Sequence, residues 1–325
     1  MTLPRTMLSV FALAAAVASG PARAQSQPLA QPSAPLTLTL GTATPGGGFP
    51  VYGQALAKVI NASDAGLLIE PRNTKGSLEN IPLLESGQLD IALVAGEPAF
   101  EALSGIQRPA AKLLIIAAMY ATPGMFVVRG DSPYRSVADL KGQPIAFGAR
   151  GSGLPILARY VLDGLGLDQE RDFNAVFLTN AADGPVMLRD GRVAALWGGG
   201  VGWPGFVAAM NEGGRFISPS ADEISRIRAK HDFLGDLVLP ANSYAGQNQA
   251  IRSVGSWSFV LARPTLDEGV AYRLTRALHR NEAAFAALLP QAGETTAANT
   301  AKAAYRAELL HPGTRRYLQE IGLIK

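Results

Sequence analysis

The 325-residue chain contains no cysteine and only three histidines. Without cysteine it has no disulfide framework, no thiolate nucleophile and no cysteine-ligated metal. A chain of this length has enough apolar residues to bury a core without such cross-links. Of the histidines, only His311 lies in a motif, where a helix-breaking His-Pro-Gly turn accounts for it. We therefore expect neither a metal nor another cofactor.

The common catalytic motifs are also missing. The sequence has no HExxH, GxSxG or GxxxxGK[ST] pattern, and the glycine-rich segment 148–153 has no lysine where a phosphate-binding loop needs one. Acidic groups such as Asp168, Glu170 and Asp172 stand in polar segments where helices begin, which is typical of caps and solvated faces. The prediction is a protein that is not an enzyme, with a small-molecule hydrolase or lyase as the minor alternative.

Neither a concentration of positive charge nor a long apolar run marks the body of the chain. The 29 Lys and Arg residues stand against 26 Asp and Glu and are scattered, without the basic stripe and interleaved aromatics of a nucleic-acid binder. After the N-terminus, no segment offers about 18 consecutive apolar residues. We expect a soluble mature protein that binds no nucleic acid and does not insert into a membrane.

The N-terminus has the order of a secretory signal peptide. Arg5 is followed by the uncharged run 7–17 and then by the small-residue segment Ala22-Arg-Ala24. The apolar run is too short to span a bilayer. We predict that residues 1–24 are a cleaved signal peptide and that residues 25–35, rich in Gln, Pro, Ala and Ser, form a flexible leader. The mature protein is then expected in the periplasm.

Short apolar segments alternate with helical patterns along the rest of the chain. Residues 36–94 have the order βαβαβ, and a second unit of similar pattern begins near residue 125. A further strand at 256–261 is followed by strongly helical spacing over 266–289. Strands joined by helices predict an α/β fold of mainly parallel sheets covered on both faces. Two such units predict two lobes with a central cleft, where open α/β sheets bind ligands.

Three glycine-rich turns, 44–49, 148–153 and 198–204, stand at predicted strand ends. Backbone N–H groups exposed in such turns, beside the positive end of a helix, suit a small anion or carboxylate. If the turns converge on one cleft, the chain is a binder of small anions. The turns contribute the predicted ligand contacts Thr44, Gly47, Gly48, Gly151, Gly153 and Gly199.

Two cations are the predicted charged contacts of an anionic ligand. Arg150 is expected to grip a carboxylate beside the donors of the turn, the alternative being a solvated loop arginine. Lys75 is either a ligand contact or, more simply, a surface cation. Ser77 and Ser152 are expected to cap helices, and a capping hydroxyl at a cleft can also donate to a ligand.

Three aromatic residues and one acid complete the predicted site. Phe49, Trp197 and Trp203 are expected to form apolar walls, although an aromatic beside an apolar strand, as Trp197 is, more often belongs to the core. Glu97 would repel a dianion if it faced the cleft. It therefore either points away from the cleft or binds an amino or amide group.

The order and spacing of several motifs resemble the TAXI family, the solute receptors of tripartite ATP-independent periplasmic (TRAP) transporters. The resemblance spans residues 38–323. It begins with a strand, a glycine turn and a helix over 40–57, and its most diagnostic part is the tail 310–322. The other matching stretches are Thr74-Lys-Gly-Ser-Leu-Glu-Asn80, Leu84-Glu-Ser-Gly-Gln-Leu-Asp90, Ser136-Val-Ala-Asp-Leu-Lys-Gly142 and Gly151-Ser-Gly153.

This resemblance implies a type II periplasmic-binding-protein fold that closes around a small organic anion and delivers it to a TRAP-type permease. It implies a first lobe of residues 36–124 and 258–325 and a second of 125–257; we expect a monomer. The presumed site departs from the family pattern at Phe49, 95–97 and Leu154, so glutamate specificity does not carry over. A receptor of an ABC importer or a sensor input on the same fold is the alternative.

Overall fold

The computed structural model of this protein describes residues 1–2, 34–304 and 306–325. The predicted signal peptide and nearly all of the predicted leader lie outside the described residues. Within the described part of the chain, no helix is both long enough and apolar enough to cross a bilayer. The architecture given below is that of residues 35–325, which form one compact unit.

Strands and helices alternate through this unit, as the apolar patterning predicts. The strands are β1 Leu36–Gly41, β2 Leu67–Arg72, β3 Ile91–Val94, β4 Leu114–Val128, β5 Pro144–Ala149, β6 Asn174–Leu178, β7 Ala195–Gly199, β8 Arg215–Ile217, β9 Gly235–Leu239 and β10 Ile251–Ala262. The main helices are α1 Gly48–Ser63, α2 Ser77–Glu85, α3 Gly96–Ser104, α4 Leu154–Gly164, α5 Asp183–Arg189, α6 Pro204–Asn211, α7 Ala221–Lys230, α8 Glu268–His279, α9 Glu282–Leu288, α10 Ala297–Ala303 and α11 Pro312–Glu320.

Parallel pairs lie toward the two ends of the strand order. β1 pairs in parallel with β2 and β3, and β5 pairs in parallel with β6 and β7. The long strands β4 and β10 join these groups by antiparallel pairing, in the order β2-β1-β3-β10-β4-β7-β5-β6. The predicted class, an α/β fold of two lobes with mainly parallel sheets, is confirmed.

β4 is the element that the sequence prediction described least well. Only its end, residues 125–128, was expected as a strand, whereas the strand runs for 15 residues. Residues 114–123 pair with β10, and from Gly124 onward β4 pairs with β7. This change of partner supports the proposed lobe boundary near residue 125, which stays a prediction. The predicted helix over 266–289 is likewise two helices, α8 and α9, separated at residues 280–281.

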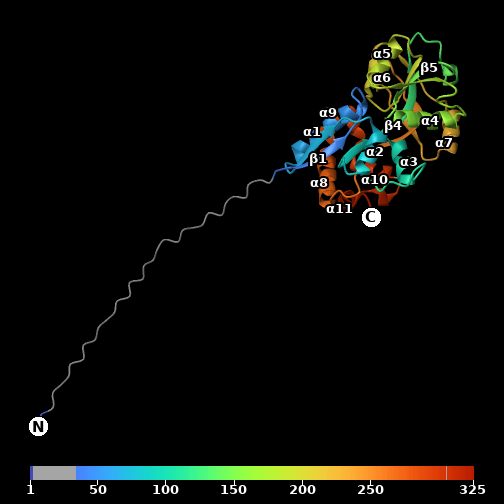
Figure 1. The fold of residues 1–325 in the computed structure, drawn as a ribbon. Helices are drawn as coiled ribbons and strands as arrows, with labels where there is room; N and C mark the ends of the chain where they lie inside the picture. Colours follow the sequence, from blue (N-terminus) through green and yellow to red (C-terminus); the bar gives the residue numbers. More distant parts are fainter. Residues whose placement is uncertain (3–33, 305) are drawn as a thin grey trace. The chain divides into compact units, whose positions relative to one another are not determined.

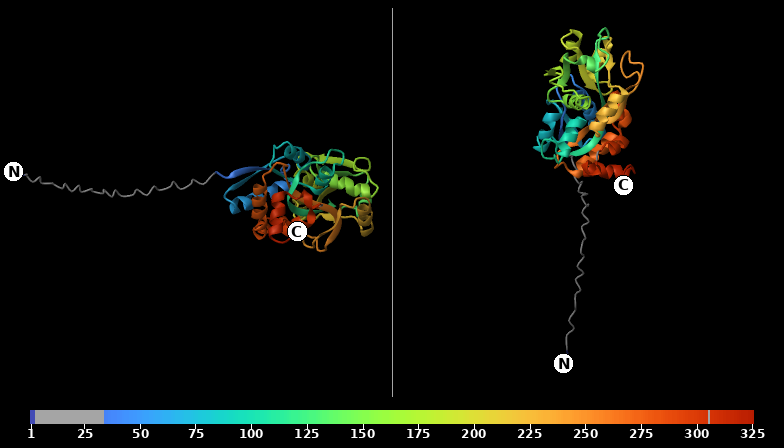
Figure 2. Two further views of the ribbon diagram at one scale, coloured as in Figure 1. Left: turned by 90° about the horizontal axis from the view of Figure 1, so that it is seen from below. Right: turned by 90° about the vertical axis from the view of Figure 1, so that its right-hand side faces the viewer.

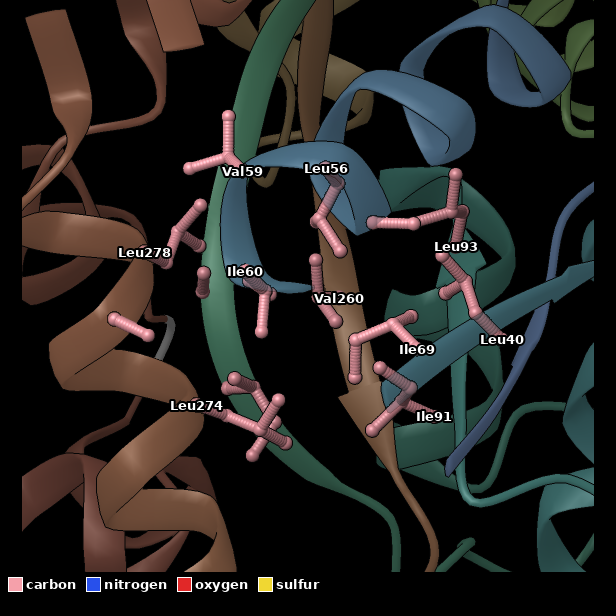
Figure 3. Close-up of a cluster of buried hydrophobic side chains, with 14 of the residues drawn as sticks. Leu40, Leu56, Val59, Ile60, Ile69, Ile91, Leu93, Val260, Leu274 and Leu278 are labelled. Carbon is pink, nitrogen blue, oxygen red and sulfur yellow. The ribbon is translucent and has the colours of Figure 1, made fainter. Parts of the chain in front are cut away.

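The first and last parts of the chain share one core. Leu56 and Ile60 of α1 are buried with Val260 of β10 and with Leu274 and Leu278 of α8 (Figure 3). The apolar residues of α8 recur near helical spacing and lie on one face of the helix. This face packs against the sheet that contains the N-terminal strands. Figures 1 and 2 show the C-terminal helices, in red, beside the N-terminal elements, in blue.

Candidate functional site

A cavity lies where the N-termini of α1, α2, α3 and α4 come together. The centres of water-sized molecules can occupy a volume of about 80 Å³ inside it. This volume is enough for a compact solute. All three predicted glycine-rich turns contribute to it. Its walls are formed by Ala43, Thr44, Gly47, Gly48, Phe49, Gly76, Ser77, Ala95, Glu97, Tyr120, Thr122, Gly148, Ala149, Ser152, Gly153, Leu154, Leu157, Leu178, Ala181, Gly199, Trp203 and Ser258.

The helices that begin at the cavity have no side-chain caps. Their N-cap residues are Gly47, Gly76, Ala95 and Gly153, and none of the four gives a side-chain hydrogen bond to the first turn. The first N–H groups of a helix have no partner within it and carry partial positive charge. In α2 the N–H of Leu78 already donates to the carbonyl of Gly151. Those first-turn N–H groups that have no protein partner can donate to an anionic group in the cavity.

Four of the other helices are capped by a side chain, whereas α5, α6 and α9 have no side-chain cap. α7, α8, α10 and α11 begin at Ser220, Asp267, Thr296 and His311, and each of these side chains accepts a hydrogen bond from the first turn. Substituting such a cap by alanine typically costs about 1 kcal/mol. Side-chain caps are thus present at four helices that begin away from the cavity and absent at α1, α2, α3 and α4.

The predicted capping roles of Ser77 and Ser152 are wrong. Ser77 is the first residue of α2, and its hydroxyl accepts the N–H of Ala95 at 3.0 Å. The hydroxyl of Ser152 donates to the carbonyl of Ala149 at 2.8 Å. Glycine precedes each helix instead, and at Gly76 the backbone φ of 114° explains why. Both serines nevertheless line the cavity.

Glu97 is the acidic residue of the cavity. It lies in the first turn of α3, only 1% of its surface is exposed, and its Oε1 accepts a hydrogen bond from Ser256 Oγ at 2.6 Å. Burial raises the pKa of Glu97 from its usual 4.5 to about 7, although the bond from Ser256 acts in the opposite direction. Glu97 is among the residues that line the cavity, and the interpretation that it binds an amino or amide group stays a prediction.

The crossing strands add polar groups that the sequence prediction did not include. Tyr120 and Thr122 come from β4, and Ser258 comes from β10. Tyr120 is 4% exposed, and its hydroxyl has no hydrogen-bond partner among the described residues. Recognising β4 as one long strand would have placed Tyr120 near the centre of the molecule. The helix-length apolar run around it concealed that placement.

Of the three aromatic residues predicted to form apolar walls, two line the cavity and one does not. Phe49 and Trp203 line the cavity. Trp197 does not, because it lies inside the core, 4.7 Å from the ring of Phe126, and its indole N–H donates to the carbonyl of Leu154 at 3.0 Å. The alternative interpretation of Trp197 as a core residue therefore describes its position.

The two predicted cations and Gly151 lie outside the cavity. Arg150 is exposed, and its guanidinium carbon lies 4.0 Å from the centroid of the Phe177 ring. Lys75 is exposed as well. Between them the backbones approach closely, since the carbonyl of Gly151 accepts the N–H of Leu78 at 3.1 Å. The expected arginine clamp is not formed in this arrangement.

Further contacts join α3 to α4 beside the cavity. The hydroxyl of Tyr160 donates to Glu101 at 2.8 Å, and Arg159 forms an ion pair with the same carboxylate. Beside them the rings of Phe100 and Phe233 stack with centroids 4.0 Å apart. The two sides of the cavity are therefore in contact in this structure, as expected of a closed form.

Comparison with known proteins shows a family and similar folds. The model of the NMT1-like family matches residues 40–322. A solved protein from Bordetella bronchiseptica RB50 is similar over 88% of this chain and 98% of its own, with 16% identity and a TM-score of 0.54.

Two further solved structures are similar to this chain. One, described for glutathione import via GshT and the cystine ABC importer TcyBC of Streptococcus mutans, covers 79% of this chain and 95% of its own (13% identity, TM-score 0.50). The other is the periplasmic aliphatic sulphonate binding protein SsuA from Escherichia coli, with 22% identity, a TM-score of 0.49 and coverage of 88% and 79%. At these identities the likeness is one of fold.

Proposed function

The chain belongs to the NMT1-like family, and from this membership and the closed cavity we propose that it is a periplasmic receptor that binds a small organic anion or amino-acid-like solute and delivers it to a membrane transporter. The observation that carries the proposal is the convergence on one cavity of four helix N-termini that have no side-chain cap. The partial positive charge of a helix N-terminus attracts an anionic group, so a cationic side chain is not required for binding.

We propose binding rather than catalysis because of the groups that face the cavity. Its ionisable side chains are Glu97 and Tyr120, and its remaining polar side chains are hydroxyls. No histidine or lysine lines it to act as a base for one of those hydroxyls. The relatives with a named role, SsuA and the Streptococcus mutans protein, are likewise described in terms of binding or import.

The partner in the membrane is proposed from the sequence. The motif order favours a TRAP-type permease, in which an ion gradient drives uptake. An ABC importer is the second candidate, favoured by the likeness to the Streptococcus mutans structure. Uptake by membrane vesicles supplied with the purified receptor distinguishes them, because a TRAP system works on an imposed ion gradient alone and an ABC system requires ATP.

A thermal-shift screen tests the receptor function itself. A ligand that binds only the folded state at about a hundred times its Kd raises the free energy of unfolding by about 2.7 kcal/mol. The screen covers amino acids, 2-oxo acids, dicarboxylates and aromatic acids. We expect stabilisation by one of these classes, and stabilisation by none would contradict the proposal. N-terminal sequencing of the exported protein tests cleavage after residue 24 and thereby the periplasmic location.

A further inference from the structure

The cavity contains a carboxyl group and no cationic side chain. Among the 22 residues that line it, Glu97 is the only acid, and none is Lys, Arg or His. The neighbouring charges are engaged elsewhere. Glu101, on the next turn of α3, is bound by Arg159 and Tyr160, and Glu294 accepts the N–H of Ala121 at 2.9 Å. Among the described residues, no cation forms an ion pair with Glu97.

Such a carboxyl group is unfavourable for a solute with two negative charges. The uncapped helix ends can serve one anionic group, but a second would lie in the same small cavity as Glu97 without a counter-ion. A buried charge without a partner is costly, and like charges in a dry cavity repel strongly. The expected outcome is the exclusion of dicarboxylates.

The same group is favourable for a solute that carries an N–H donor. An ammonium group beside Glu97 supplies the missing opposite charge and keeps the carboxylate ionised. The hydroxyls of Tyr120 and Ser258 also line the cavity, and that of Tyr120 has no protein partner within the described residues. The rest of the wall is largely apolar, with Phe49, Leu154 and Trp203 among its members.

We propose that Glu97 determines specificity by accepting an N–H donor of the solute, so that the receptor takes compact α-amino acids with uncharged, apolar side chains and excludes dicarboxylates. The solute carboxylate faces the uncapped helix ends, its ammonium group faces Glu97, and its side chain contacts the apolar wall. This inference rests on the proposed receptor function and adds to it the class of solute and the residue that reads it.

The test compares matched solutes by isothermal titration calorimetry. L-Valine and 3-methyl-2-oxobutanoate share their carbon skeleton and carboxylate, but the second has a carbonyl oxygen in place of the ammonium group. L-Leucine and 4-methyl-2-oxopentanoate form the same pair with a longer side chain, and succinate is the dianion. We expect the wild-type protein to bind the better amino acid about thirtyfold or more tightly than its oxo acid, and succinate not measurably.

Glu97→Gln is the decisive variant, because the amide keeps the size of the side chain and can still bond to Ser256. It should reduce the preference for the amino acid to below about threefold. Glu85→Gln is the matched control, since Glu85 pairs with Arg108 outside the cavity, and it should retain the full preference.

Two results would overturn the proposal. They are binding of an oxo acid or succinate as tight as that of the amino acid, and an unchanged preference in Glu97→Gln. If solutes of another class bind while none of these does, the receptor function survives and this inference fails. If the whole screen of solutes gives no binding, the receptor function fails with it.

Discussion

The two walls of the cavity differ in chemistry. The wall built by α1 to α3, the turn before α1 and the crossing strands has six polar side chains: Thr44, Ser77, Glu97, Tyr120, Thr122 and Ser258. The opposite wall, built by residues 148–203, presents Leu154, Leu157, Leu178, Ala181 and Trp203, with Ser152 as its polar side chain. One wall can thus hold the polar groups of a solute, while the other covers its apolar surface.

This difference suggests an order of events on binding. Hydrogen bonds to the polar wall fix the solute's orientation, and closure of the apolar wall then removes water from them. Electrostatic interactions strengthen when water is excluded, so closure raises the affinity of contacts already made. The solute is therefore expected to bind first to the wall that contains Glu97, with hinge motion at β4 and β10 completing the site.

The largest expected effect is on the free energy of unfolding, which should depend on pH because Glu97 is buried in the polar wall. Because burial raises the pKa of Glu97 from 4.5 to about 7, the folded protein retains a proton that the unfolded chain releases in this range. Stability contributed by this group is therefore lost as pH rises from 4.5 to 7. At about 1.4 kcal/mol per pKa unit, the loss is about 3 kcal/mol.

Urea denaturation across this pH range measures that effect. The difference in free energy of unfolding between the wild type and Glu97→Gln isolates the contribution of this group, because all other titrating groups are shared. The difference should move in favour of Glu97→Gln as pH rises, whereas Glu85→Gln should parallel the wild type. If the difference in free energy of unfolding between the wild type and Glu97→Gln stays constant from pH 4.5 to 8, burial does not raise the pKa of Glu97.

The second prediction concerns the place where the walls meet. A Cβ added at Gly153 would collide with the Cβ of Ala95 on the opposite wall. Overpacking of this kind costs about 1–3 kcal/mol, and here it opposes closure, so Gly153→Ala should weaken solute binding by about tenfold or more. Calorimetry with the best solute of the screen measures the loss.

Gly293→Ala is the control for this substitution, because its added Cβ would have Ala286 as nearest neighbour at an ordinary 3.8 Å. It should leave affinity unchanged. Wild-type affinity in Gly153→Ala would mean that the walls need not come together as closely as they do in this structure.

A smaller effect is expected from the apolar wall. Trp203 lines the cavity and lies 4.9 Å from the ring of Phe206, so phenylalanine preserves the packing better than alanine would. Trp203→Phe removes contact area and should weaken binding of the amino acid and the oxo acid alike, by about 1 kcal/mol. A changed ratio between the two affinities would show that this wall also reads polar groups of the solute.

The smallest effect is expected outside both walls. Arg150→Ala should change affinity by less than about threefold, since its guanidinium lies over Phe177 at the surface. Stability should fall by about 0.5–1 kcal/mol through the lost cation–π contact. An arginine clamp, as predicted from the sequence, would instead cost about 2 kcal/mol or more of binding, so the calorimetric result separates the two arrangements.

Local features explain the parts of this site that could be predicted from the sequence. The turn around Gly47 and the turn before α4 were found because glycine at a strand end followed by helical spacing is a local pattern. Glu97 could be predicted as a site residue for the same reason, since it closely follows the apolar strand β3. Tyr120 was missed because its position depends on β4 pairing with β10, whose residues lie more than a hundred positions later.

The amino-acid sequence by itself determined the alternation of strands and helices, the class of fold and the glycine turns that begin α1 and α4, because each depends on residues within a few positions of one another. Only the tertiary structure decided which side chains face the cavity. Arg150 is exposed and lies over the ring of Phe177, and pairing of Phe126 with Trp197 places that indole in the core. Side-chain direction at those positions is set by strand register and by the approach of distant turns, neither of which a local pattern contains.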